Sequence, residues 1–135
     1  MKYLLDTNVV SDFVKGHPLV MSRLKQTAPH LIGISSITAM EIEYGLQLNP
    51  ARARKLLSIL EPLLASIETL DFSRDDALTA ATLRASLQSR GTPIGAYDVL
   101  LAGCALRRGM IFVTANTREF ERVSGLQLEN WREAP

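Results

Sequence analysis

The sequence predicts an α/β fold, a three-layer α/β/α sandwich with a central parallel sheet. Short apolar runs alternate along the chain with longer amphipathic segments. Parallel neighbouring strands need long crossover connections, usually helices, so this alternation predicts a sheet with helices on both faces. The length of 135 residues, with 47% hydrophobic and 21% charged residues, indicates one compact domain over residues 1–135 rather than a disordered chain.

Turn and capping residues divide the first half of the chain. Asp6-Thr7-Asn8 suits the start of a helix, Pro18 the first turn of another, and Ser35-Ser36 the cap of a third. We therefore expect, in order, a strand at 3–5, a helix from about 8 to 16, a helix at 20–26, a strand at 31–34, a helix from about 36 that ends before Asn49-Pro50, and an amphipathic helix at 51–64.

The second half carries equally clear boundaries. Ser73-Arg74-Asp75-Asp76 resembles a capping box, and Gly91 suits a helix C-terminus. The segment 96–108 is almost wholly apolar, which predicts a buried helix. The elements expected here are a strand at 67–70, a helix from 74 to about 90, the buried helix at 96–108, a strand at 111–113, a short helix after 114–117 and an edge strand within 125–131.

Composition excludes several kinds of site. The 15 Lys and Arg nearly balance the 14 Asp and Glu, and a net charge of +1 excludes strong attraction of the whole molecule to nucleic acid. Cys104 is the single cysteine and lies in an apolar helix, so we expect a core thiol. His17 and His30 lie beside prolines, which indicates loops and a poor zinc site. No apolar run approaches the roughly 20 residues that span a bilayer, so we expect a cytoplasmic protein without membrane contact.

Four acidic residues lie where ligands collect in an open parallel sheet, at the carboxyl ends of the strands. Asp6 follows the first strand, and Glu41 lies in the first turns after the second. Asp98 opens the buried helix before the fourth strand, and Glu119 follows that strand. A carboxylate in an apolar helix is costly unless it is paired, so Asp98 is the strongest indication that the four converge.

Each acid also has an ordinary structural explanation. Asp98 can complement its helix dipole, and Asp6 can end a strand or cap a helix. Glu41 and Glu119 can complete capping boxes that begin at Thr38 and Asn116, and for Glu119 the two interpretations are balanced.

The position of Glu41 on its helix favours an inward orientation. Glu41 shares a stripe with Tyr44, Gly45 and Leu48, and Gly45 permits close packing. Glu43 lies roughly 200° away around the helix, so we expect Glu43 in solvent.

Carboxylates with an amide, and no cluster of Cys or His, form a hard oxygen site. Such donors suit Mg²⁺, with Mn²⁺ as the alternative, rather than zinc or copper. A bound ion of this kind polarises a phosphoryl oxygen and lowers the pKa of a bound water. The acids therefore predict metal-dependent hydrolysis of a phosphodiester, in which the cation also offsets repulsion between acids and substrate.

Four sequence blocks resemble the PIN-domain ribonucleases and, within them, the VapC toxins of bacterial toxin-antitoxin pairs. The resemblance covers nearly the whole chain and rests on the blocks in this order: Leu4-Leu5-Asp6-Thr7-Asn8; Ser36-Ile37-Thr38 followed by Glu41 and Tyr44-Gly45; Thr92-Pro93-Ile94-Gly95-Ala96-Tyr97-Asp98; and Thr114-Ala115-Asn116-Thr117-Arg118-Glu119-Phe120.

The resemblance implies catalytic and binding roles for particular residues. Asp6, Glu41 and Asp98 match the family's acids, and they are expected to hold Mg²⁺. Either Asn116 or Glu119 is expected to complete the catalytic set, because many PIN domains have an aspartate near the position of Asn116. Two polar neighbours, Thr7 and Asn8, are expected to orient Asp6 or a metal-bound water.

The resemblance also implies substrate and partners. It implies a Mg²⁺-dependent endoribonuclease that arrests translation, with transfer RNA as substrate and the anticodon loop of the initiator as the target in similar toxins. It implies a VapB-type antitoxin and a homodimer. The apolar residues Phe13, Val14, Leu19 and Met21 could contact the antitoxin, although core packing explains them equally.

Two other functions compete with the nuclease. An adaptor that binds RNA or protein could keep the fold without cutting. A receiver-type signalling domain also has an acidic Mg²⁺ site, but it needs paired early acids and a late Lys, whereas Asp6 has no acidic neighbour and no Lys follows Lys55. Arg90, Arg118 and Arg122 lie near the expected rim, where each is explained by an ordinary surface charge.

Overall fold

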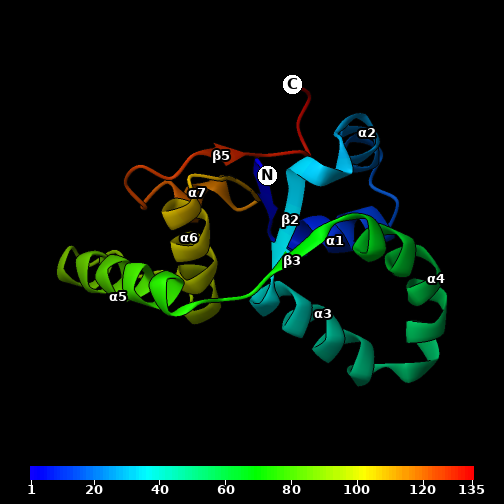
Figure 1. Cartoon of the computed structure of the whole chain (residues 1–135), viewed down its shortest axis with the longest axis horizontal. Helices are drawn as coiled ribbons and strands as arrows, with labels where there is room; N and C mark the ends of the chain where they lie inside the picture. Colours follow the sequence, from blue (N-terminus) through cyan, green and yellow to red (C-terminus); the bar gives the residue numbers. More distant parts are fainter.

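The computed structural model describes residues 1–135 and contains a central five-stranded sheet (Figure 1). Every strand pairing is parallel, and the strand order is β3-β2-β1-β4-β5. The strands are β1 (Tyr3–Leu5), β2 (Ile32–Ser35), β3 (Glu68–Leu70), β4 (Ile111–Val113) and β5 (Leu128–Glu129). The predicted α/β/α sandwich with a parallel sheet is confirmed.

Seven α-helices cover the two faces of this sheet (Figure 1). One core lies mainly between the sheet and α5 and α6, and a second core lies between the sheet and α1, α2 and α4. The helices are α1 (Thr7–Val14), α2 (Pro18–Gln26), α3 (Ser36–Leu48), α4 (Pro50–Ser66), α5 (Arg74–Ser89), α6 (Ala96–Arg108) and α7 (Thr117–Phe120). No helix is long and apolar enough to cross a membrane.

Strand β1 shows why the sequence makes two cores. Its side chains alternate between the faces of the sheet, so Leu4 lies in the α5–α6 core while Tyr3 and Leu5 lie in the other. In β4, Phe112 and Val113 divide in the same way. A strand that is buried on both faces reads as a continuous apolar run, which is why these short segments were recognisable from sequence.

Most predicted elements are confirmed, with shifted ends. Helix α2 begins at Pro18 because His17 caps it, accepting a hydrogen bond from the backbone N–H of Val20. A 3₁₀ turn, Pro29–Leu31, delays β2 to Ile32. The C-terminal strand β5 has two residues, far shorter than the expected region. Cys104 is a buried free thiol, as expected.

The expectation for the α3 stripe is wrong. Tyr44 and Leu48 are 61% and 67% exposed, and a β-carbon at Gly45 would meet no atom within 4 Å. In Figure 1, α3 extends away from the sheet and meets α4 at its far end. Its second half packs through Ile42 and Leu46 against the second core, so the face with Tyr44 and Leu48 is left exposed. Thr38 is the fully buried residue of this helix.

The strand order determines where the functional site can form. The chain runs from β1 outward through β2 to β3, and then returns to the other side of β1 as β4. In open parallel sheets such a reversal creates a crevice at the carboxyl ends of the two strands concerned. Asp6 directly follows β1 and Thr114 directly follows β4, so both lie at this crevice.

Candidate functional site

Asp6 both caps a helix and contributes a buried carboxylate to the crevice. Its Oδ1 accepts a hydrogen bond from the Thr7 backbone N–H at 2.7 Å, which caps α1. Its Oδ2 accepts one from the Thr114 hydroxyl at 2.9 Å. Asp6 is 5% exposed, and burial raises its pKa above the ordinary value, while these two hydrogen bonds oppose the rise. The structural and functional explanations of Asp6 are therefore compatible.

Glu41 is joined to the Asp6 region through Thr7. The Thr7 hydroxyl donates to Glu41 Oε1 at 2.8 Å and lies 3.3 Å from the Thr38 hydroxyl. Ser35, not Thr38, caps α3, so the capping-box explanation of Glu41 is excluded. Glu41 is half-buried and Glu43 is exposed, as expected, although the stripe that led to this expectation is not buried.

Asp98 lies in the first turn of α6, whose N-terminus points toward the crevice because α6 runs opposite to the strands. Its carboxylate is packed against the loop before the helix, since a β-carbon at Gly95 would lie 2.6 Å from Asp98 Oδ2. The pKa of Asp98 is raised to about 6, first by burial, then by the negative charges of Glu119 and Asp6 and by hydrogen bonding with Glu119.

Glu119 is the fourth carboxylate of the cluster, and Asn116 supports it. Glu119 Oε1 accepts a hydrogen bond from the Gly95 backbone N–H at 3.1 Å, and Oε2 accepts one from Asn116 Nδ2 at 2.5 Å. Asn116 makes no side-chain cap on α7, so the capping-box explanation of Glu119 is excluded as well. Asn116 is exposed, whereas Glu119 is half-buried beside Asp98.

The structure thus brings Asp6, Glu41, Asp98 and Glu119 close enough that the other three charges each disfavour the ionisation of Asp98. All the donors are carboxylate oxygens, which fit a hard divalent cation, and a cation would relieve their mutual repulsion. No group of three or more Asp, Glu, His or Cys side chains has the geometry of a metal site in this structure. The fit of the four acids to a hard cation therefore rests on their chemistry and charge.

Two hydroxyl groups of this network were not singled out from sequence. Thr114 is fully buried and accepts a hydrogen bond from the Asn116 backbone N–H while donating to Asp6. The β1–β4 register pairs Leu5 with Val113, so the next residues, Asp6 and Thr114, come side by side. The sequence signal that could have indicated Thr114 is its position as a polar residue directly after a strand.

Thr38 was the second hydroxyl that sequence reasoning missed. It is fully buried in the first turn of α3. A buried hydroxyl normally has a hydrogen-bond partner, so a threonine at this position indicates a polar contact. Asn8 is exposed and donates no hydrogen bond to Asp6 or Glu41, so its expected role in orienting Asp6 or a metal-bound water stays a prediction.

The parallel sheet and the acids at the carboxyl ends of its strands place the protein among the α/β proteins with an acidic site. Sequence comparison identifies the family. The PIN domain family model matches residues 3–126. The tRNA(fMet)-specific endonuclease VapC of Salmonella typhimurium is 37% identical over 131 residues, covering 97% of this chain and 98% of that protein. Ribonuclease VapC2 of Haemophilus influenzae is 37% identical over 132 residues, with the same coverage.

Solved structures agree with this comparison. DNA-bound VapBC from Salmonella typhimurium contains a chain with a TM-score of 0.88 and 36% identity, covering 97% of this chain and 98% of that one. VapBC2 from Rickettsia felis, bound to a promoter DNA fragment, gives a TM-score of 0.88 and 34% identity, covering 97% and 99%. The chain belongs to the PIN-domain family and, within it, to the VapC ribonucleases. The receiver-type alternative is wrong, because that fold has the strand order 2-1-3-4-5.

Proposed function

We propose that this protein is the toxin of a VapBC-type pair, a single PIN domain that hydrolyses RNA phosphodiester bonds and so arrests translation in the cytoplasm. The observation that carries this proposal is the convergence of Asp6, Glu41, Asp98 and Glu119 at the reversal in strand order. Four carboxylates at one edge of the sheet repel a polyanion unless a cation offsets their charge, and that requirement links them to metal-dependent phosphodiester chemistry.

In this proposal Asp6, Glu41 and Asp98 hold Mg²⁺, or Mn²⁺ as the alternative, and Glu119 completes the catalytic set. When bound, the cation polarises the phosphoryl oxygen and lowers the pKa of a bound water for in-line attack. The protein's own task is to hold the carboxylates in place. The hydroxyl of Thr7 fixes Glu41, and the amide of Asn116 orients Glu119.

Asn8 remains a proposed contributor at the rim of the site. Its exposed amide follows Thr7 directly in the first turn of α1, where a bound RNA or a bound water could approach it.

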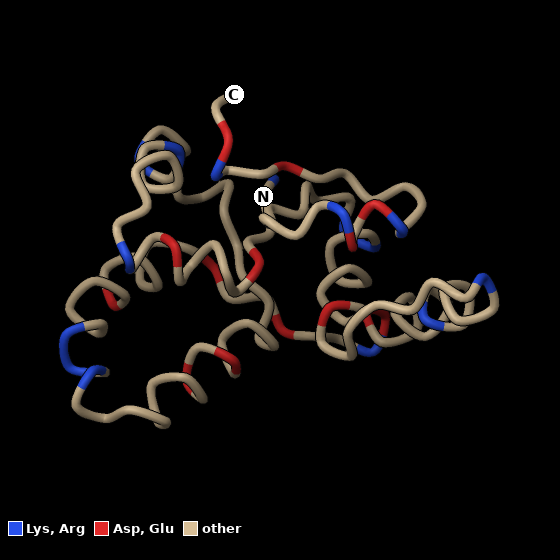
Figure 2. The backbone as a smooth tube through the Cα atoms, turned by 180° about the vertical axis from the view of Figure 1, so that it is seen from behind, with Lys and Arg blue, Asp and Glu red and all other residues tan.

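For the substrate we propose transfer RNA, with the anticodon loop of the initiator as the specific target. The support is the 37% identity, over 97% of this chain, to a protein named as a tRNA(fMet)-specific endonuclease. Basic residues are present for phosphate contacts: Figure 2 shows them in the first part of α4, just after its turn from α3, where Arg52, Arg54 and Lys55 lie. Single-stranded loops are the form of RNA whose bases and backbone are most accessible.

For partners we propose a VapB-type antitoxin and a second copy of this chain. A pocket of about 260 Å³ lies between α1, α3 and α4, and both Val14 and Glu41 line it. An antitoxin segment in this pocket would cover the approach to the acids. The exposed α3 residues Met40, Tyr44 and Leu48 are apolar surface that a homodimer would bury, and light scattering of the purified chain tests for the dimer.

The decisive experiment incubates the purified protein with total bacterial RNA, with Mg²⁺ or with EDTA, beside the variant Asp98→Asn. We expect discrete RNA fragments only from the wild type with metal, and a loss of about 10²-fold or more in the variant, because it removes one metal ligand. Glu43→Gln is the matched control, since Glu43 is the exposed acid of α3 and should retain full activity. Cutting in EDTA, or full activity of Asp98→Asn, would overturn the proposal. RNA binding without any product would favour the adaptor.

A further inference from the structure

Arg122 differs from an ordinary surface charge in its hydrogen bonds. Its guanidinium Nη1 donates to the carbonyl oxygen of Pro93 at 3.0 Å. In return, the Arg122 carbonyl accepts a hydrogen bond from Arg90 Nη2 at 3.1 Å. Two arginines therefore join the loop before α6 to the segment after α7, which are far apart in sequence. We define this pair of contacts as the Arg90–Arg122 strap.

The two segments that the strap joins, the residues around Arg122 and the loop before α6, differ in how many core contacts they make. On one side, Phe120 is fully buried with its ring 4.8 Å from that of Phe112, and Val123 is 3% exposed. The core therefore fixes the backbone on both sides of Arg122. On the other side, Gly91, Pro93 and Gly95 are exposed, and Ile94, which is partly buried, is the loop residue that packs against the core. The two hydrogen bonds of the strap therefore tie this loop to the α7 segment.

The strapped loop touches two of the clustered acids directly. The backbone N–H of Gly95 donates to Glu119 Oε1 at 3.1 Å, and the backbone at Gly95 packs against Asp98 Oδ2. A shift of the loop therefore moves Asp98 relative to Glu119. Misplacement by about 1 Å in an active site can cost up to 10²-fold in rate, so small changes in this loop are sufficient to matter.

We propose that Arg122 is a positioning residue that, by holding the Pro93–Gly95 loop against the α7 segment, sets the separation of Asp98 and Glu119. It acts through the loop and does not touch substrate. The inference rests on the proposed nuclease function for its kinetic consequences, but its structural consequences at Gly95 are independent of that function. Arg118 is the matched comparison, because it is an exposed arginine beside Glu119 that makes no side-chain hydrogen bond or ion pair.

The test compares Arg122→Ala, Arg122→Lys and Arg118→Ala by four measurements on the full chain. Cleavage of purified total tRNA gives kcat and an apparent KM. Filter binding of the same tRNA in EDTA gives RNA affinity without turnover. NMR hydrogen exchange of the Gly95 amide and calorimetric Mn²⁺ binding report on the loop and on the acids.

We expect Arg122→Ala to lower kcat about tenfold while the apparent KM and tRNA affinity stay unchanged. The Gly95 amide should exchange faster and Mn²⁺ should bind more weakly. Arg122→Lys should recover part of each effect, because one amine can still reach a carbonyl oxygen, and Arg118→Ala should resemble wild type.

Other outcomes overturn the inference. Weaker tRNA binding with unchanged kcat in both alanine variants would make Arg122 a phosphate contact instead. Unchanged Gly95 exchange and Mn²⁺ affinity in Arg122→Ala would show that the strap does not order the loop. If Arg122→Ala does not fold, Arg90→Ala removes the other contact of the strap and must speed Gly95 exchange. If the wild type cuts no RNA, the nuclease proposal fails, while the Gly95 and Mn²⁺ measurements still decide the inference.

Discussion

Asp98 stands among carboxylates that oppose its ionisation, which makes its charge state a property of the whole cluster. Its pKa of about 6 lies above the ordinary value of 3.8. Folding therefore favours the protonated form, and the contribution of Asp98 to stability is fully present below about pH 3.8 and lost as the pH rises through about 6. A bound divalent cation would reverse this dependence, since it favours the ionised form.

The first prediction follows from the raised pKa of Asp98, which makes its ionised form destabilising. In EDTA, Asp98→Asn should be more stable than wild type at pH 7.5 by on the order of 1 kcal/mol, because solvent screens this partly exposed carboxylate, and the difference should shrink toward pH 4. Thermal unfolding measured between pH 4 and 8 checks this, with the exposed Asp75→Asn as control. A difference between variant and wild type that does not vary with pH would contradict the raised pKa.

The second prediction concerns the buried hydroxyl of Thr114. Thr114→Val keeps the shape of the side chain but removes the donor to Asp6 Oδ2 and the acceptor for the Asn116 N–H. We expect a loss of about 1 to 3 kcal/mol in unfolding free energy and at least tenfold slower RNA cleavage. Urea unfolding and cleavage assays measure the two effects. Thr82→Val alters an exposed helical threonine and should change neither; equal effects in both variants would refute the role of Thr114.

At the scale of elements, the ends of two helices meet at a buried acid. Asp76 completes the capping box of α5 with Ser73, and it also forms ion pairs with Arg107 and Arg108 at the end of α6, at 2.6 and 3.2 Å. Burial alone would raise the pKa of Asp76, but the hydrogen bonds from Ser73 and the two arginines prevail and lower it to about 2. One carboxylate thus aligns the two helices of the α5–α6 core.

The third prediction is that Asp76→Ala lowers the free energy of unfolding by about 3 to 5 kcal/mol, because it leaves two arginines without their buried partner. Because the folded pKa is depressed, the stabilisation by Asp76 is present above about pH 3.8 and falls as the pH approaches about 2. Denaturant unfolding at pH 7 and at pH 3 measures both effects. Asp75→Ala, one residue away and exposed, should cost far less, and a similar cost would show that the ion pairs contribute little.

Helices and strands were predictable wherever local chemistry decides them. The capping box at Ser73–Asp76 is formed as expected, and Gly91 adopts the left-handed φ of +69° that ends α5. The interpretation of the α3 stripe failed for a physical reason. Periodicity shows which residues share a face of a helix, but it does not show whether another layer covers that face.

For the whole molecule, the four acids were predictable because each lies directly after a strand or within the first two turns of a helix at one edge of the sheet. Their hydrogen bonds were not, since these depend on which strands are neighbours. The contact of Thr114 with Asp6 requires β1 and β4 to be adjacent in a particular register. The contact of Glu119 with the Gly95 backbone likewise joins residues that lie 24 positions apart in the chain.

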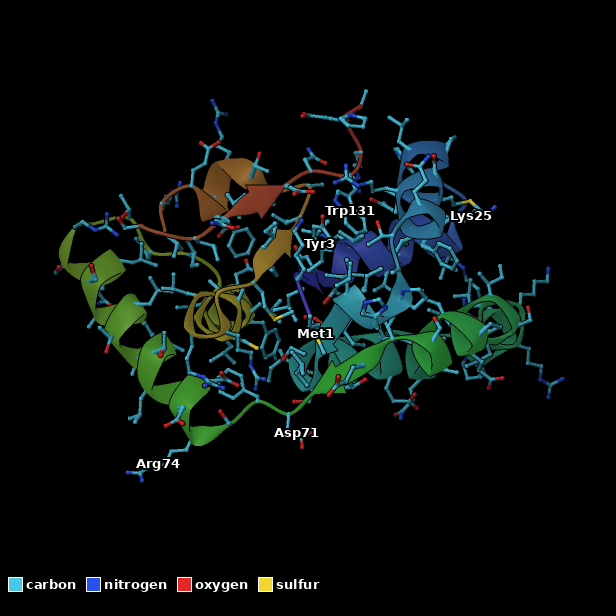
Figure 3. The ribbon with its side chains drawn as sticks, turned by 45° about the horizontal axis from the view of Figure 1, so that its top comes forward. Met1, Tyr3, Lys25, Asp71, Arg74 and Trp131 are labelled. Carbon is cyan, nitrogen blue, oxygen red and sulfur yellow. The ribbon has the colours of Figure 1, made fainter.

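The C-terminal segment closes the molecule against its first elements, and this leads to the last prediction. Trp131 is 2% exposed, and its ring lies 5.3 Å from that of Tyr3 in an edge arrangement (Figure 3). Its Nε1 donates to Glu129, which also pairs with Arg23 of α2, and Arg132 donates twice to Asp12 of α1. The last residues therefore join β1, α1 and α2 at once.

Trp131→Ala should lower the free energy of unfolding by about 3 to 5 kcal/mol, because it opens a cavity beside Tyr3 and leaves β5 without its anchor. Trp131→Phe keeps an aromatic ring against Tyr3 and loses the Nε1 hydrogen bond, so it should cost less than half as much. Urea unfolding followed by circular dichroism measures both variants, since neither retains the single tryptophan as a fluorescent probe. Equal losses in the two variants would assign the anchoring to the hydrogen bond with Glu129. No loss in either would mean that the C-terminal segment is held by Arg132 and Asp12 alone.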